Sequence, residues 1–194
     1  MKFAFAGIAL ASMYAATPAF AGPLGTHKGM AKSSITGLKE IAPSKYSSVN
    51  APIKSSLFES YVYQFGGDGL CYVKGIGPNI TTNVYGSSLK SEYDRIKTAM
   101  VDKYGSTYTN GEFLLPGSIW DEADDFMMGL LQKDRFHSSI WDIEKGAVLP
   151  DNLDTIYVGV AALRRDTGYL AIEYYYDNYD ECQASVTANQ TDAL

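Results

Sequence analysis

Histidine and cysteine are scarce in this chain of 194 residues, which contains two of each. A Ser-His-Asp hydrolase would need His27 or His137 as its base, and Ser138, the neighbour of His137, would point to the opposite face of a strand. A zinc site needs three or four ligands in register, and two distant histidines and two cysteines do not supply them. The densest glycine run, 66–69, lacks the Lys-Ser/Thr of a phosphate-binding loop. We therefore expect no catalytic triad, no metal centre and no cofactor.

Basic residues are outnumbered by acidic ones, 16 to 22, which gives a formal net charge of −6. Nucleic-acid phosphates need a basic surface, so this balance disfavours nucleic acid as a partner. It equally disfavours anionic membranes and leaves basic proteins or cationic ligands open. No apolar run long enough for a membrane span follows residue 21.

Residues 1–21 have the layout of a secretory signal peptide. Lys2 precedes an almost unbroken apolar run over 3–16, and Ala-Phe-Ala at 19–21 is a small-x-small cleavage site. The alternative, a membrane anchor, would need an apolar run of about 20 residues. We expect cleavage to leave residues 22–194 as a protein of the periplasm or the external medium, without a membrane span.

The two cysteines, Cys71 and Cys182, have one possible intramolecular pairing. Export would expose both thiols to an oxidising compartment, which favours a disulfide between them over two buried free thiols. The bond would close a long loop and stabilise the fold by about 4–5 kcal/mol in the chain-entropy model.

Hydrophobic periodicity and turn residues define the expected elements. The sequence predicts strands over 57–65, 70–76, 136–143, 155–163 and 169–176, and helices over 34–41, 87–104, 122–132 and 182–186. Helices do not alternate one by one with strands, so a parallel sheet is disfavoured. We predict a single α+β domain over 22–194, an antiparallel sheet with its helices packed on one side. A strand–strand–helix grouping in 22–85 and in 86–194 suggests two pseudo-repeated halves.

Tyrosine is abundant, with fifteen in the chain. In the strand expected over 169–176, Tyr169, Glu173 and Tyr175 alternate with apolar residues and should face outward. Exposed tyrosine beside carboxylates suits recognition of a protein or glycan, and Tyr175 and Glu173 would be the centre of that face. On this interpretation Tyr175 can be replaced without opening a cavity. The alternative is that tyrosine fills half-buried strand positions, where its propensity is good.

Four carboxylates cluster at the first turn of the expected helix 122–132: Asp121, Glu122, Asp124 and Asp125. Their order does not match an EF-hand loop, and acidic residues are favourable in a first helical turn. We interpret them as that turn, and whether they bind a cation stays open.

Several stretches resemble uncharacterised exported bacterial proteins. They include Gly-Ser-Ile-Trp-Asp-Glu at 117–122, Phe-Met-Met at 126–128, Lys-Asp-Arg at 133–135 and Gly-Leu-Cys at 69–71. The likeness covers most of residues 22–194, and it implies no activity. The opening 25–39 resembles the small βαββ units of envelope proteins such as BamE or of β-lactamase-inhibitor-like domains, which implies a fold rather than a function.

We expect an exported, soluble, non-enzymatic binding protein or envelope accessory, for instance an inhibitor of a basic partner. Its partner would be a basic protein or a glycan of the envelope. The alternative function is a small periplasmic hydrolase that uses paired carboxylates.

Overall fold

The computed structural model describes residues 22–191. The signal peptide predicted for residues 1–21 lies outside the described residues. The helices are α1 (Ser87–Tyr104), α2 (Phe126–Gln132) and α3 (Tyr179–Thr191). The strands are β1 (Lys39–Ala42), β2 (Lys45–Ser48), β3 (Ser60–Gly66), β4 (Gly69–Ile76), β5 (Ile80–Thr81), β6 (Thr109–Asn110), β7 (Phe113–Leu114), β8 (Arg135–Phe136), β9 (Ser138–Asp142), β10 (Leu153–Arg164) and β11 (Thr167–Tyr176).

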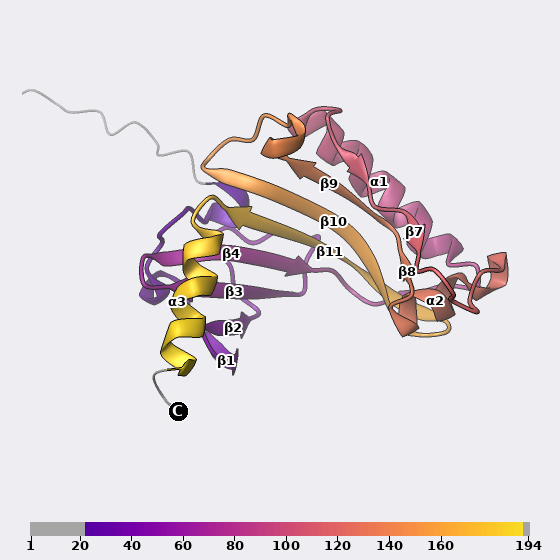
Figure 1. Ribbon diagram of the computed structural model, residues 1–194, viewed down its shortest axis with the longest axis horizontal. Helices are drawn as coiled ribbons and strands as arrows, with labels where there is room; N and C mark the ends of the chain where they lie inside the picture. The colour runs from indigo at the N-terminus through magenta and orange to yellow at the C-terminus, as the bar shows by residue number, and fades with distance from the viewer. Residues whose placement is uncertain (1–21, 192–194) are drawn as a thin grey trace, which may run out of the picture.

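Nine of these strands form one curved antiparallel sheet (Figure 1). Its order is β1-β2-β3-β4-β11-β10-β9-β6, with β5 also paired to β11, while β7 and β8 form a separate ribbon. The predicted α+β class with an antiparallel sheet is confirmed. The sheet runs through both stretches for which the sequence suggested halves, because β4 pairs directly with β11.

Helix α1 has the bounds that its apolar stripe predicts. Its buried residues, which recur every three or four positions, are Leu89, Tyr93, Ile96, Met100 and Tyr104. They pack on β10 and β11, where Leu170, Ile172 and the alternate residues of β10 form the core face. The helix ends at Gly105, whose φ of +86° is a conformation that favours glycine.

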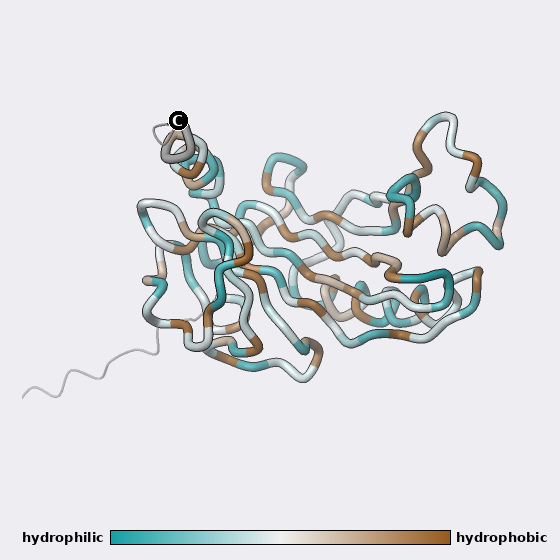
Figure 2. The backbone as a smooth tube through the Cα atoms, turned by 90° about the horizontal axis from the view of Figure 1, so that it is seen from below, coloured by the Kyte–Doolittle hydropathy of each residue, from teal (hydrophilic) through white to brown (hydrophobic). Residues whose placement is uncertain are grey.

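Helix α3 departs from the expectation that all helices pack on one side of the sheet. It contacts β3 and β4 on the face opposite α1, where Cys182 joins a second apolar cluster with Cys71 and Tyr72. Figure 2 shows α3 and the segment between β7 and α2 rising from the same side of the sheet at its two ends. No helix of residues 22–191 covers the sheet face between them.

The helix expected over 34–41 is wrong, because β1 occupies Lys39–Ala42 and pairs with β2. Gly37, inside the expected range, has a φ of +70°, so the backbone leaves the helical conformation where the helix would have to continue. The helix expected over 122–132 is shorter, with a 3₁₀ turn at Ala123–Asp125 before α2.

The N-terminal segment is fixed to the hairpin of β3 and β4. The amide of Gly29 donates to the carbonyl of Leu70 at 2.8 Å, and the amide of Leu70 donates to the carbonyl of Met30 at 3.0 Å. Gly69, the residue before Leu70, has a φ of +90°. A Cβ atom on Gly69 would lie 2.4 Å from the carbonyl oxygen of Gly29. Glycine is therefore required where the segment crosses the hairpin.

Candidate functional site

The open face of the sheet carries the three residues that the sequence singled out. Tyr169, Glu173 and Tyr175 alternate on β11 with buried Leu170, Ile172, Tyr174 and Tyr176, and all three are half-buried. Antiparallel pairing places Lys74 and Tyr157 on either side of Glu173, and Tyr72 beside Tyr175. Tyr169 lies opposite Ala161, toward the start of the strand. The predicted alternation is confirmed, and the pairing gathers Glu173 and Tyr175 but not Tyr169 into one cluster.

Glu173 is the centre of a hydrogen-bonded network on this face. Its Oε2 accepts hydrogen bonds from the hydroxyls of Tyr72 at 2.8 Å and Tyr175 at 2.7 Å, and its Oε1 pairs with Lys74 Nζ at 2.9 Å. Burial alone would raise the pKa of this carboxyl group, but the hydrogen bonds from Tyr175 and Lys74 outweigh burial and hold the pKa below its ordinary value. The carboxylate is thus kept ionised and its acceptor positions are occupied.

Three tyrosine rings pack together beside this network. The ring centroids of Tyr72 and Tyr175 are 4.9 Å apart, and those of Tyr175 and Tyr179 are 4.8 Å apart. Tyr179 comes from α3, so the cluster joins the helix to the sheet. Burial, followed by the charge of Glu173, raises the pKa of Tyr72 and of Tyr175, which keeps both hydroxyls protonated as donors. Because Tyr175 is packed and hydrogen-bonded, its replacement would disturb this cluster more than the sequence pattern suggested.

A bulge in β4 directs two side chains toward α3. The pairing register with β3 shifts so that Tyr72 lies opposite Gln64 and Cys71 is the extra residue. Cys71 and Tyr72 consequently belong to the same apolar cluster, and Cys71 is bonded to Cys182 of α3. The predicted disulfide is confirmed, with 6.3 Å between the two Cα atoms.

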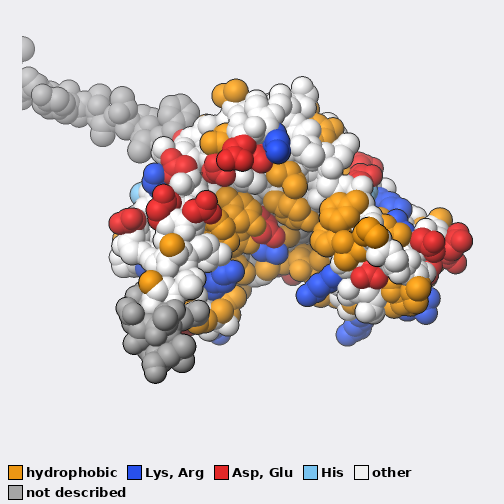
Figure 3. All heavy atoms as spheres, viewed as in Figure 1, with side chains coloured by type: hydrophobic (Ala, Val, Ile, Leu, Met, Phe, Trp, Pro, Cys, Tyr) orange, Lys and Arg blue, Asp and Glu red, His pale blue; other side chains and the backbone are white. Residues whose placement is uncertain are grey.

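An acidic cavity of about 270 Å³ opens where β11 leads into α3. Its walls include the rings of Tyr175 and Tyr179, and its carboxylates are Glu144, Asp154, Asp177 and Asp180. Among the described residues, only Asp177 of these four has a basic partner, Lys28 at 2.6 Å. In Figure 3, acidic side chains stand along the rim of a hollow lined by hydrophobic side chains, a class that includes tyrosine. The site therefore combines aromatic surface with unneutralised negative charge.

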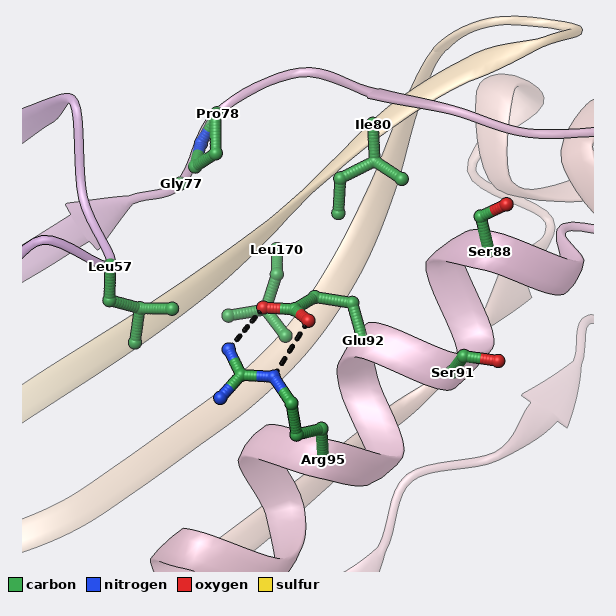
Figure 4. A pocket seen from close by; sticks show the side chains of 9 residues that line it. All are labelled: Leu57, Gly77, Pro78, Ile80, Ser88, Ser91, Glu92, Arg95 and Leu170. Atoms are coloured by element: carbon green, nitrogen blue, oxygen red, sulfur yellow. Dashed lines mark hydrogen bonds and ion pairs between the residues drawn. The ribbon is translucent and has the colours of Figure 1, made fainter.

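Another cavity, of about 540 Å³, lies on the other face between α1 and the end of β4 (Figure 4). Leu57, Ile80 and Leu170 form apolar walls, and the Glu92 carboxylate faces the guanidinium of Arg95. Arg95 donates to Glu92 from Nε at 2.9 Å and from Nη2 at 2.6 Å, and these bonds lower the pKa of Glu92. Glu92 and Arg95 are paired with each other, so this cavity offers mainly an apolar surface to a ligand.

The four acidic residues that precede α2 lie in and around the 3₁₀ turn Ala123–Asp125. Asp121, Glu122 and Asp124 are exposed, and Asp125 is half-buried. Across residues 22–191, no group of three or more His, Cys, Asp or Glu side chains is arranged to hold a metal ion. Within the same range, none of the helices has both the length and the apolar character needed to cross a membrane.

Comparisons of the chain with models of protein families, with curated proteins and with solved structures give no match. The function is therefore argued from the site itself.

Sequence reasoning missed most of the residues around Glu173 and Tyr175. Tyr72 and Lys74 were visible only as members of a hairpin, and nothing in the sequence paired that hairpin with β11. Asp154 and Asp180 reach the acidic cavity from a strand and a helix that are adjacent only in the fold. The one usable signal was the half-polar side of β11.

Proposed function

We propose that this is an exported, non-enzymatic binding protein that captures a basic partner protein on the open face of its sheet. The observation that carries the proposal is the acidic cavity beside the tyrosine cluster. Tyr175 belongs to both, so one continuous surface offers aromatic contact and negative charge. An inhibitor of a basic hydrolase or an accessory of envelope assembly would need such a surface.

The cavity suits the side chain of arginine or lysine. A guanidinium can stack on the tyrosine rings while it donates hydrogen bonds to carboxylates. Among the described residues, Asp154 and Asp180 have no basic partner and are open to this role, whereas Asp177 is already paired with Lys28. Charge complementarity of this kind also speeds association with a basic protein.

The same geometry favours binding over hydrolysis by paired carboxylates. A general acid needs a raised pKa and a free position toward substrate, whereas Glu173 has a lowered pKa and three donors around it. Asp142, on strand β9 beyond β10, uses its Oδ1 to accept a hydrogen bond from the amide of Glu144. Both carboxylates thus support structure on this face.

Export is the second part of the proposal, supported by the layout of residues 1–21 and by the disulfide. The intact mass of protein recovered from the periplasm or the medium should correspond to a chain that begins at Gly22. A mass that includes residues 1–21 would contradict this part without bearing on the binding surface.

The binding test uses a tetra-arginine peptide and its tetra-citrulline counterpart, which has nearly the same shape without the charge. The oxidised protein should bind the arginine peptide in a titration and bind the citrulline peptide far more weakly. The double variant Asp154→Asn/Asp180→Asn should weaken binding by about tenfold or more, as expected when charge-assisted contacts are lost. Capture of proteins from an envelope extract should fall in parallel.

A matched control separates a local site from the overall charge. Asp121→Asn/Asp124→Asn changes the net charge by the same amount on exposed positions outside the acidic cavity. It should leave binding within about twofold at physiological salt, where distant charges are screened. Equal losses in the two double variants, or equal binding of the two peptides, would refute the proposed surface.

A further inference from the structure

A second polar cavity lies at the other end of the molecule, between α1, α2 and the ribbon of β7 and β8. Its volume is about 440 Å³. Phe113, Phe126 and Phe136 supply aromatic walls, and Lys90, Arg135 and His137 supply basic groups. This concentration of basic side chains is unexpected in a chain of net charge −6.

Within residues 22–191, Lys90 and Arg135 form no ion pair with a carboxylate. Arg135 donates from Nη2 to the carbonyl of Trp120 at 2.9 Å, but its buried Nε has no acceptor. The Nε2 atom of His137 is also buried without a partner. Among the described residues Lys90 has no ion pair, and its ammonium lies 3.8 Å from the centroid of the Phe126 ring. Two charged side chains of the cavity, Lys90 and Arg135, are thus left without a carboxylate partner, whereas Nε2 of His137, in a ring whose Nδ1 faces Glu112, is an acceptor.

The electrostatics of the cavity favour an anion as the bound group. Desolvation, followed by the charge of Arg135, lowers the pKa of Lys90, so a negative charge between the two would relieve an unfavourable arrangement. Glu112 offsets part of the positive charge, but it is half-exposed and lies 3.5 Å from His137 Nδ1. Burial lowers the pKa of His137, so its ring is mainly neutral near pH 7.

We propose that this cavity binds a small organic carboxylate with a flat apolar body. Its carboxylate would pair with the guanidinium of Arg135 and the ammonium of Lys90, and its body would lie against the phenylalanine rings. Lys90 and Arg135 against Glu112 leave one net positive charge, which matches a monoanion better than a phosphate dianion. The cavity volume is within the range typical of sites for small molecules. The site is separate from the proposed protein-binding face.

The test is a titration with phenylacetate, in which binding is measured by calorimetry and by the NMR signals of the His137 ring. Phenylacetamide, the neutral analogue, and inorganic phosphate are the comparison probes. Phenylacetate should bind saturably and at least about tenfold more tightly than phenylacetamide, because only the ionised group forms charge-assisted hydrogen bonds. Equal binding of the two, no saturable binding, or preference for phosphate would overturn the proposal.

Variants locate the site. Lys90→Met removes the ammonium group and keeps an apolar side chain of similar length. This variant should weaken phenylacetate binding about tenfold. Lys103→Met, in the last turn of the same helix, is the matched control and should leave binding unchanged. Arg135→Gln should abolish binding, and Lys90→Met keeps the proposal testable if Arg135→Gln does not fold. Equal effects of Lys90→Met and Lys103→Met would refute the location.

Discussion

Replacing Glu173 by glutamine tests whether an ionised carboxylate organises the open face. The change keeps the shape of the side chain but removes the charge to which Tyr72, Tyr175 and Lys74 donate. The side chains of Glu173 and Lys74 are 16% and 24% exposed, so most of the network is shielded from water. Hydrogen bonds to a charged group contribute about 1.5–3 kcal/mol each, and those of one network are not additive.

We expect Glu173→Gln to lower the free energy of unfolding at pH 7 by about 2–3 kcal/mol. This is below the about 3–5 kcal/mol for breaking a fully buried ion pair, because Lys74 keeps partial access to water. Urea denaturation followed by tyrosine fluorescence and circular dichroism would measure the difference. Glu92→Gln is the control, since Glu92 pairs with the well-exposed Arg95, and it should change stability far less.

The pH dependence of this difference distinguishes charge from shape. The pKa of Glu173 is lower in the folded protein than in the unfolded chain, so its ionisation stabilises the fold above the unfolded pKa. That contribution is lost as pH falls through the lowered folded pKa. The difference in unfolding free energy between wild type and Glu173→Gln should therefore have its full value at pH 7 and disappear at acid pH. A gap that stays constant down to acid pH, or a gap below about 0.5 kcal/mol at pH 7, would refute the reasoning.

Two further predictions concern the contacts that fix the ends of the hairpin. The Cys71–Cys182 bond closes a sequence separation of 111 residues. Its reduction should lower the free energy of unfolding, measured by urea titration, by about 4–5 kcal/mol. A decrease below about 1 kcal/mol would contradict this prediction. Gly69→Ala should cost about 2–4 kcal/mol, because its left-handed backbone is combined with a clash against Gly29. Gly67→Ala, which has open space around its Cβ, should be nearly neutral in the same urea titrations.

Local sequence patterns predicted an element correctly where that element buries a single face of its own residues. The apolar stripe of α1 predicted its bounds, because that stripe is the face that covers β10 and β11. The turn residues at 66–69 predicted the hairpin of β3 and β4. The segment 34–41 was misassigned because its apolar spacing also fits a helix, while its strand is specified by pairing with β2, a contact that spacing does not reveal.

The candidate site was predicted only in part for the same physical reason. Alternation along β11 placed Glu173 and Tyr175 on one face correctly, since that rule depends on a single strand. The cluster with Tyr72 depends on the register of β4 against β11 and on the bulge at Cys71. Register and bulges arise from long-range packing, so a single sequence left these partners unassigned.

Helix α3 makes the two proposed binding functions separable by one redox experiment. It supplies Tyr179 and Asp180 to the open face, and the Cys71–Cys182 bond holds it there. The carboxylate cavity is built by α1, α2, β7 and β8 and contains no residue of α3. Reduction under conditions in which circular dichroism shows a folded sheet should therefore weaken binding of the tetra-arginine peptide and leave phenylacetate binding intact. Parallel loss of both would show that the two ends of the sheet are coupled, and the surfaces could then no longer be treated as independent.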